Sequence, residues 1–301
     1  MRDIITICVV NFSCKWGDKE KNLCRMEEYI QAAAARGANI VVFPETALTG
    51  YDDEEEKEFH QKMHYLKAEY VPGDSSERIA KLTKKLNIYV VYGLPERDKE
   101  NSDIIYNSAA VVGPEGVCGT YRKLHMPFSE ANWATVGQYP YFFETPWGRI
   151  GVGICYDCYA FPEIMRYYRA MGCRLYINST AVGSGVTGQN VRTSLEYLCA
   201  TNTIYIATAG LFGPAPVTDM LGGSSILGPG NKSPEVFYYA GRPFDHPDAA
   251  QGEMMIATVD LSYTERSFLA KLWSEKHPHW RPDLYVKMYQ EAGKQAKYQK
   301  S

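Results

Sequence analysis

Short apolar runs of strand length alternate with longer stretches of helical pattern along this chain of 301 residues. Residues 4–10, 40–43 and 88–92 read as strands, and residues 19–36 and 75–86 read as the helices between them. Such alternation is typical of βαβ crossovers, in which helices cover the faces of a sheet. It constrains the chain to an α/β fold with helices on the outer faces of its sheets.

The middle of the chain adds strands that are spaced for antiparallel pairing. Residues 108–112 and 119–121 flank the sequence Gly113-Pro114-Glu115-Gly116, which favours a turn. Further strands are expected at 150–154, 175–177, 204–209, 224–227, 236–239 and 254–259, and further helices at 161–171 and 189–200.

Two segments of the chain resemble each other. Residues 36–50 read RGANIVVFPETALTG, and residues 171–185 read MGCRLYINSTAVGSG. Each follows a predicted helix, has glycine at its second position, runs through a short apolar strand and ends in polar residues. We interpret them as parts of two similar βα halves that stack face to face within one domain, because no linker or low-complexity segment separates them.

Composition excludes several classes of protein. A net charge of -3 without a long basic run leaves no electrostatic footprint for nucleic acid. No apolar run approaches the roughly 18 to 20 residues of a membrane span, and the segment MRDIITICVVNF reads as a strand rather than a signal peptide. Eight scattered cysteines favour reduced thiols and a cytoplasmic protein. The acidic run at 52–56 is interpreted as a solvated loop or helix start.

Three polar residues stand just past the ends of apolar strands, where α/β folds place functional groups. They are Glu45, Lys123 and Cys155. A carboxylate base, a cation and a thiol together suit acyl transfer, in which the thiol attacks a carbonyl-like carbon and the cation supports the oxyanion. Taken singly, the same residues are also explained as a cap, a solvated lysine and a small buried hydrophobe.

The second cysteine of the sequence Cys155-Tyr156-Asp157-Cys158 allows two other interpretations. A redox pair is disfavoured because an acidic residue between two thiols opposes thiolate formation. A zinc site would need a second ligand pair, which the other cysteines do not supply at this spacing, and the histidines of HPHW (277–280) read as surface or packing residues. Cys158 is expected to be a buried thiol or part of a pocket wall.

Three segments together resemble the nitrilase superfamily of carbon–nitrogen hydrolases: FPETALTGY (43–51), YRKLHMPFSE (121–130) and GVGICYDCYAFPE (151–163). The resemblance implies a four-layer αββα sandwich over residues 1–270, with residues 271–301 forming a C-terminal extension that contacts a dimer partner. It implies a homodimer or a higher homo-oligomer that hydrolyses a small-molecule amide. No metal or organic cofactor, nucleic acid or membrane is implied.

Carried over residue by residue, the resemblance assigns Glu45 as general base, Lys123 as oxyanion stabiliser and Cys155 as nucleophile, with Glu130 orienting the lysine or the substrate. We expect Glu45 and Lys123 to favour ionisation of the thiol. The backbone N–H of the residue after the cysteine is expected to support the oxyanion. The candidate substrate-binding residues are Tyr51, Tyr156, Tyr159, Asn178 and Thr180.

The residues after the nucleophile favour one branch of the superfamily. True nitrilases typically carry Cys-Trp-Glu there, whereas this chain has Cys155-Tyr156-Asp157, which is more similar to amidases and carbamoylases. Members that bind a substrate carboxylate tend to carry arginine three or four residues after the cysteine, where this chain has Cys158 and Tyr159. We therefore expect an amidase for a small neutral or amine-bearing amide. The alternative is a carbamoylputrescine-like N-carbamoyl amine amidohydrolase. A true nitrilase, a non-catalytic binding module and a thiol–disulfide protein are less favoured.

Overall fold

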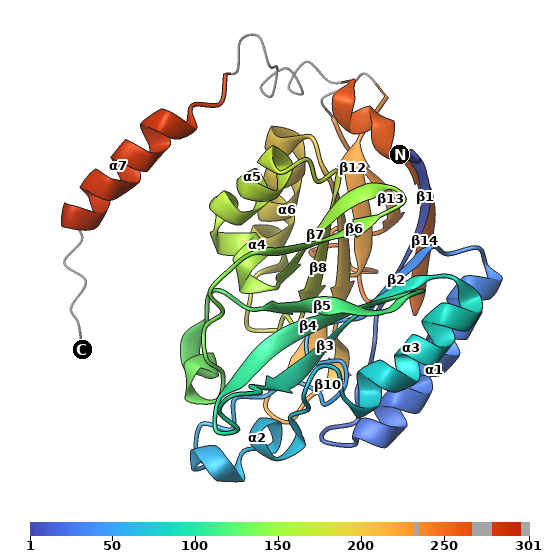
Figure 1. Cartoon of the computed structure of the whole chain (residues 1–301), viewed down its shortest axis with the longest axis vertical. Coiled ribbons are helices and arrows are strands. Elements are labelled where there is room, and N and C mark those ends of the chain that lie inside the picture. Colours follow the sequence, from blue (N-terminus) through green and yellow to red (C-terminus); the bar gives the residue numbers. More distant parts are fainter. Residues whose placement is uncertain (232–234, 267–278, 296–301) are drawn as a thin grey trace.

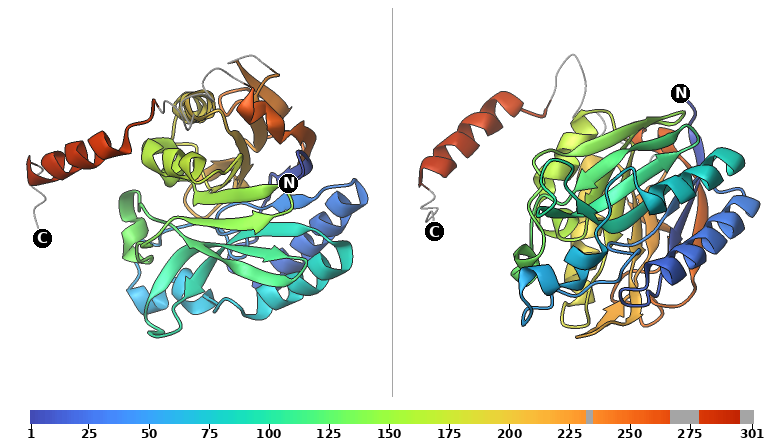
Figure 2. Two further views of the ribbon diagram at one scale, coloured as in Figure 1. Left: turned by 45° about the horizontal axis from the view of Figure 1, so that its top comes forward. Right: turned by 60° about the horizontal axis from the view of Figure 1, so that its bottom comes forward.

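The computed structural model describes residues 1–231, 235–266 and 279–295, and it contains two six-stranded sheets packed face to face. Helices cover the outer face of each sheet, so the layers run helix, sheet, sheet, helix (Figures 1 and 2). The predicted αββα sandwich is confirmed. No helix of the described ranges is long and apolar enough to cross a membrane.

The first sheet comes from the N-terminal part of the chain and one late strand. Its strands, in spatial order, are β14 (Met254–Asp260), β1 (Ile4–Val10), β2 (Ile40–Val42), β3 (Tyr89–Arg97), β4 (Ile105–Gly113) and β5 (Gly116–Arg122). Strands β1, β2 and β3 are parallel, and the other neighbours pair antiparallel. Helices α1 (Lys19–Ala35) and α3 (Asp74–Leu86) cover this sheet (Figure 1).

The second sheet repeats this arrangement with later strands. Their spatial order is β13 (Val236–Gly241), β12 (Ser225–Pro229), β9 (Tyr205–Gly210), β8 (Leu175–Thr180), β7 (Gly148–Ile154) and β6 (Tyr141–Thr145). Strands β7, β8 and β9 are parallel and the outer pairs antiparallel. It is covered by α4 (Tyr156–Ala160), α5 (Pro162–Ala170) and α6 (Gly188–Asn202).

The two similar segments of the sequence occupy equivalent places in the two sheets. The first contains β2 and the second contains β8, and each is the middle member of a set of three parallel strands. The prediction of two stacked halves is therefore confirmed. Its consequence is that the polar residues after β2 face those after β8.

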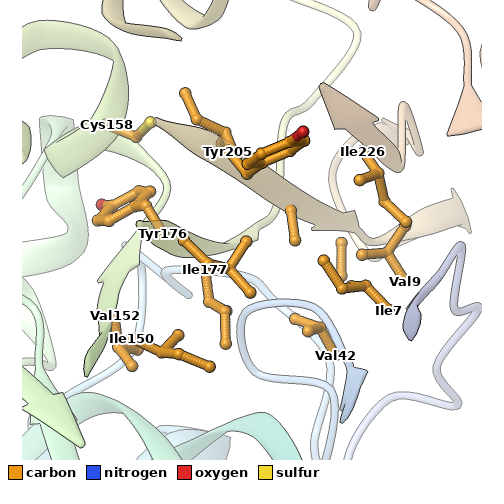
Figure 3. Packing of buried hydrophobic residues seen from close by; sticks show 14 of the residues in the cluster. Ile7, Val9, Val42, Ile150, Val152, Cys158, Tyr176, Ile177, Tyr205 and Ile226 are labelled. Carbon is orange, nitrogen blue, oxygen red and sulfur yellow. The ribbon is translucent and has the colours of Figure 1, made fainter. Parts of the chain in front are cut away.

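Alternating side chains explain why the first sheet is buried on both faces. Ile5, Ile7 and Val9 of β1 point into the layer between the sheets, whereas Cys8 and Val10 point to the helices. Figure 3 shows this middle layer, in which Val42 of the first sheet lies among residues of the second sheet such as Ile177 and Ile226.

Several elements were not predicted from the sequence. They are β6, the small hairpin of β10 (Phe212–Pro214) and β11 (Asp219–Leu221), α2 (Met63–Lys67), α4, and the 3-10 turns η1 (Phe59–Gln61), η2 (Phe128–Asn132) and η3 (Leu261–Glu265). All are short, so their apolar periodicity is too brief to read. The helix expected at 161–171 begins at Pro162, because proline suits the first helical turn, where no N–H partner is needed.

The C-terminal helix α7 (Pro282–Gln295) stands away from the sandwich (Figure 1). Its apolar side chains Leu284, Val286, Met288 and Tyr289 are between 42% and 61% exposed. A hydrogen bond of 2.6 Å from the Tyr289 hydroxyl to Glu163 links α7 to α5. The predicted boundary at residue 270 lies outside the described residues.

Candidate active site

Four candidate side chains lie where the two sheets open at one edge. Glu45 follows β2, Lys123 follows β5, Cys155 follows β7, and Glu130 stands on η2. Glu45, Lys123 and Glu130 are fully buried, and Cys155 is 9% exposed. Loops far apart in the sequence therefore bring three charges next to a shielded thiol.

Lys123 is held between two carboxylates. Its Nζ donates to Glu45 Oε1 at 2.7 Å and to Glu130 Oε2 at 2.6 Å. Burial acts to lower the pKa of Lys123, but the charges of Glu130 and Glu45 overcome it and raise that pKa well above its usual value. Burial raises the pKa of Glu130 to about 7, against the opposing effect of Lys123. The lysine is a fixed cation, and Glu130 is the group that titrates near neutrality.

Asn107 on β4 joins the two carboxylates and was missed in the sequence. Its Nδ2 donates to Glu45 Oε1 at 2.7 Å and to Glu130 Oε1 at 2.8 Å, and its carbonyl accepts from Lys123 N at 2.8 Å. The sequence carries little signal of it, because Asn107 stands directly before the predicted strand 108–112, whereas β4 begins at Ile105. Asn107 fixes the spacing of the glutamates around the ammonium.

Cys155 occupies a strained turn between β7 and α4. Its φ of 49° and ψ of -106° are unusual for a residue with a side chain, so the surroundings must hold it there. Its N–H donates to Ser179 O at 2.9 Å and to Asn178 Oδ1 at 3.1 Å. The turn presents the thiol beyond the end of the strand.

Burial opposes the ionisation of the Cys155 thiol that we expected Glu45 and Lys123 to favour. Burial and the charge of Glu45 raise the pKa of Cys155 to about 12, and the opposing effect of Lys123 is smaller. The Lys123 ammonium, which pairs with Glu45 and Glu130, lowers the pKa of the thiol by less than burial raises it. Cys155 therefore rests as a neutral thiol.

The backbone of Ala181, just after β8, connects Glu45 with the thiol. Its N–H donates to Glu45 Oε2 at 2.8 Å, and its carbonyl lies 3.8 Å from Cys155 Sγ, which donates to it. One carboxylate oxygen thus faces the sulfur side of the site while the other binds Lys123. A proton leaving the sulfur has Glu45 as a nearby acceptor.

Asp157, also missed as a functional residue, ties the cysteine turn to the lysine loop. Its buried carboxylate accepts from the Tyr121 hydroxyl at 2.7 Å, from His125 N at 3.0 Å and from Leu124 N at 3.4 Å. Its Oδ1 also lies 2.8 Å from His125 Nδ1. It thereby connects elements of both sheets on either side of Lys123.

The candidate substrate-binding residues fall into two groups. The Tyr51 hydroxyl donates to Glu130 Oε2 at 2.8 Å, so it belongs to the charged cluster. The Tyr159 hydroxyl donates to Thr180 Oγ1 at 2.7 Å, and the Asn178 amide contacts Cys155, Tyr159 and Thr208. Tyr156 is half-buried against Phe161. Their roles toward a substrate stay predictions.

A small pocket of about 20 Å³ lies at this edge of the sheets. Tyr51 lines it together with Trp16, Phe212 and Met220. Among the described residues, those that line it include none with a formal charge. The pocket has room for about one water molecule, and Tyr51 is the one candidate residue among the described residues that line it.

The acidic run at 52–56 forms a loop, as expected, but only part of it is solvated, because Glu55 and Glu56 are exposed while two other acids are buried. Asp52 and Glu54 are 8% and 6% exposed, and Lys62 is 3% exposed. The Lys62 ammonium binds the carbonyl oxygens of Asp53, at 2.8 Å, and Glu54, while the Glu54 carboxylate accepts from Met63 N. The Glu54 carboxylate also pairs with the Lys57 ammonium, and Asp52 Oδ1 accepts from Glu54 N at 2.7 Å, so contacts within the segment satisfy these buried acids.

The alternative reading of the cysteines receives little support from the geometry. Cys158 is 2% exposed, as expected for a buried thiol, and both Cys155 and Cys158 are free. Within residues 1–231, 235–266 and 279–295, no three His, Cys, Asp or Glu side chains are grouped to hold a metal ion. His279 is exposed, and His277 lies outside the described residues.

The geometry sets what the site can do. A carboxylate can accept a proton from the adjacent thiol, and an ammonium held beside that carboxylate can stabilise an oxyanion formed at the same place. The whole arrangement is shielded from water, which strengthens each electrostatic contact. It suits attack of the sulfur on a polarised carbon.

Comparisons with known proteins agree with this geometry. The model of the family described as carbon-nitrogen hydrolase matches residues 6–266. The omega-amidase NIT2 of Danio rerio is 30% identical over 262 residues, which cover 81% of this chain and 84% of that protein. An amidase structure from Nesterenkonia sp. superposes with a TM-score of 0.75 at 18% identity, over 96% of this chain and 97% of that one. Nit3 of Saccharomyces cerevisiae, from the nitrilase superfamily, has a TM-score of 0.74 at 22% identity, over 87% and 92% of the two chains. At these identities the two structures show a shared fold.

Proposed function

The chain belongs to the carbon–nitrogen hydrolase family, as its three segments indicated, and from this premise we propose that it is a cysteine-dependent amidase. It releases ammonia from a small neutral or amine-bearing amide through a thioester on Cys155. The observation that carries the proposal is the buried arrangement of Glu45 and Lys123 next to a neutral thiol. The name of the zebrafish relative supports amide hydrolysis as the reaction.

The first step follows from the protonation states. Since the Cys155 thiol rests neutral, its proton passes to Glu45 as the sulfur attacks the amide carbon, rather than beforehand. The carbonyl oxygen becomes an oxyanion, and the Lys123 ammonium stabilises it together with the backbone N–H of Tyr156. Removing one such donor typically costs on the order of a hundred- to a thousandfold in rate.

The later steps return the proton. Protonated Glu45 gives its proton to the departing nitrogen, because an amide nitrogen does not leave as an anion. Glu45 then removes a proton from water, which attacks the thioester, frees the acid and restores the Cys155 thiol. In this scheme the hydrogen bonds of Glu130 and Asn107 fix the positions of Lys123 and Glu45 relative to each other.

A substrate without a carboxylate is supported by the residues after the nucleophile. The positions three and four residues after Cys155 carry a buried thiol and a tyrosine, so no cation stands there to pair with a carboxylate. The zebrafish relative is named for omega-amide hydrolysis, and these residues favour a different acyl group here.

The decisive experiment is intact-protein mass spectrometry during turnover, with ammonia release measured in parallel. The panel holds primary amides with and without amines, N-carbamoyl amines, omega-amides of dicarboxylic acids and nitriles. We expect an acyl adduct on Cys155 with neutral or amine-bearing amides, absent in Cys155→Ala. A carbamoyl adduct would move the assignment to N-carbamoyl amine hydrolysis. The absence of both an adduct and ammonia with every compound would contradict the proposed amidase function.

The assembly, domain limits and location extend the proposal. We propose a cytoplasmic homodimer, a catalytic domain over residues 1–270 and an extension over 271–301 that packs on the partner. The exposed apolar side chains of α7 and the eight free cysteines support this. Light scattering of the full chain, compared with the double variant Val286→Asp and Met288→Asp, tests the assembly. A monomeric wild type, or an unchanged mass in the variant, would contradict this role of α7.

A further inference from the structure

Glu130 is fully buried, yet it stands on a turn with little support of its own. The turn η2 spans five residues, and no side chain caps its first turn. Its first residue, Phe128, is 92% exposed and has a φ of 47°, which is unusual for a residue with a side chain. Contacts from elsewhere must therefore hold Glu130 against Lys123.

Both oxygens of the Asp53 carboxylate accept hydrogen bonds from side chains on the two sides of Glu130 in this turn. Asp53 Oδ2 accepts from the Ser129 hydroxyl at 2.9 Å, and Asp53 Oδ1 accepts from the Trp133 indole N–H at 2.9 Å. The two donors lie one residue before and three residues after Glu130. Asp53 therefore grips the turn on each side of the glutamate.

Asp53 is itself fixed in place. Its carbonyl oxygen accepts from the buried Lys62 ammonium at 2.8 Å, and the Trp133 ring stacks on buried His64 with ring centres 3.9 Å apart. Two residues earlier, the Tyr51 hydroxyl binds Glu130 Oε2 at 2.8 Å. The segment 51–64 thus reaches Glu130 from its carboxylate and from its backbone turn.

We propose that Asp53 is a positioning residue for catalysis, which acts by clamping the turn that carries Glu130 and thereby fixes Lys123. The inference rests on the proposed function, in which Lys123 stabilises the oxyanion. The acidic run at 52–56 thereby gains a role in catalysis through Asp53, although no reaction step uses its carboxylates directly. The effect is on the transition state, because a displaced Lys123 misses the oxyanion while the substrate still binds.

The chemistry of the clamp separates hydrogen bonding from charge. An indole N–H can only donate, whereas a serine hydroxyl can donate or accept. In Asp53→Asn the amide oxygen can accept from Trp133 and the amide N–H can donate to Ser129, so both contacts survive. In Asp53→Ala both are lost. Glu55, an exposed acid of the same run, provides the matched control Glu55→Ala.

The test measures kcat and KM per titrated Cys155 for an amide that wild type hydrolyses. Asp53→Ala is expected to lower kcat about tenfold and to change KM by no more than about twofold, as for a lost hydrogen bond that positions a charged group. Asp53→Asn is expected within about threefold of wild type, and Glu55→Ala equal to it. The substitution Asp53→Ala is also made in the Glu130→Gln variant, and the rate of acylation is measured in a single turnover. There Asp53→Ala is expected to cause no further loss of rate.

Three results would overturn the clamp: wild-type kcat in Asp53→Ala, an equal loss in Asp53→Asn, or losses that multiply with those of Glu130→Gln. If Asp53→Ala does not fold, Trp133→Phe and Ser129→Ala remove the donors singly, and each is expected to lower kcat about threefold. A wild type inactive on every amide would refute the proposed function separately. The rate at which iodoacetamide alkylates Cys155, compared among the same variants, would then decide whether the clamp governs the cluster.

Discussion

The two sheets bring unlike groups to one site. The first sheet and its loops supply Glu45, Asn107, Lys123 and Glu130, which form a charged, hydrogen-bonded cluster. The second sheet supplies the neutral thiol of Cys155, with the side-chain amide of Asn178 and the hydroxyl of Thr180 beside it. The first half is assembled for charge and the second for a nucleophile that carries none at rest.

This difference separates preorganisation from reactivity. Lys123 has its place set by two carboxylates whether or not the sulfur is present. Cys155 has its place set by a strained turn and by the backbone of the neighbouring strand β8. The halves share the apolar layer between the sheets, and hydrogen bonds join them at the site, such as that from Ala181 N to Glu45 and that from the Ser179 hydroxyl to Phe43 O at 2.9 Å. At the site itself, most of the hydrogen bonds that hold Lys123 come from its own half.

Removing the nucleophile should have the largest effect on rate and a small effect on the fold. In Cys155→Ala the charged cluster keeps its contacts, so we expect a loss of about a thousandfold or more in ammonia release. Circular dichroism and the unfolding midpoint are expected to stay close to wild type. Cys158→Ala is the matched control and should stay active, and its inactivity would revive the paired-thiol reading.

Removing the central cation should damage both rate and stability. Lys123→Met leaves Glu45 and Glu130 buried without their partner, so we expect a loss of about 3 to 5 kcal/mol in the free energy of unfolding. The rate is expected to fall about a hundred- to a thousandfold, because the oxyanion loses a donor. Urea unfolding and amide turnover measure the two effects. An unchanged unfolding free energy would mean that the charged half is not assembled around Lys123.

Weakening the contact between the halves should have an intermediate effect. Asp157→Asn removes a buried charge that accepts from Tyr121, Leu124 and His125. We expect unfolding to become easier by about 1.5 to 3 kcal/mol, the usual worth of hydrogen bonds to a charged group. Turnover is expected to fall about tenfold or more, since the thiol shifts relative to Lys123. Full activity in a destabilised Asp157→Asn would show that the halves stay aligned without it.

Lowering the pH should affect the charged half of the site alone. Its effect on kcat should be smaller than the effects of the substitutions above. Glu130 faces Lys123, Asn107, Tyr51 and Glu45, and its pKa is about 7. An acid gains a proton below its pKa, so the pair with Lys123 weakens as pH falls through 7. We expect kcat to fall severalfold, up to about tenfold, between pH 8 and pH 6. A pH–rate profile measures this fall, and the same limb in Glu130→Gln would assign it to another group.

The sequence predicts the proposed catalytic residues better than it predicts the residues that hold them in place. Glu45, Lys123 and Cys155 follow recognisable strands, so their convergence follows from the rule that strand ends meet at one edge of a sheet. The stacking of the halves was visible in the likeness of residues 36–50 and 171–185. These features depend on local pattern and on the order of elements.

The supports depend on three-dimensional neighbours and left little local trace. Asn107 interrupts a strand, and Asp157 sits between the cysteines, where it was weighed only for its effect on the thiols. The whole acidic run looked solvated because the contact of the Lys62 ammonium with the backbone carbonyl oxygens of Asp53 and Glu54 cannot be read from spacing alone. The raised pKa of Cys155 was also missed, because it depends first on the burial of the sulfur and then on the charge of Glu45, and neither follows from local pattern.

The raised pKa of Cys155 has a consequence for how the enzyme ages. Peroxides oxidise thiolates, and the first product of that attack is a sulfenic acid that ends the nucleophile's use until it is reduced. A thiol that is 9% exposed and keeps its proton between turnovers offers such oxidants a poor target, in contrast to the exposed Cys24 and Cys118. We expect activity to outlast the oxidation of these surface cysteines during peroxide treatment. In the proposed mechanism Cys155 loses its proton only as it attacks the substrate, and we expect this to slow its oxidation between turnovers.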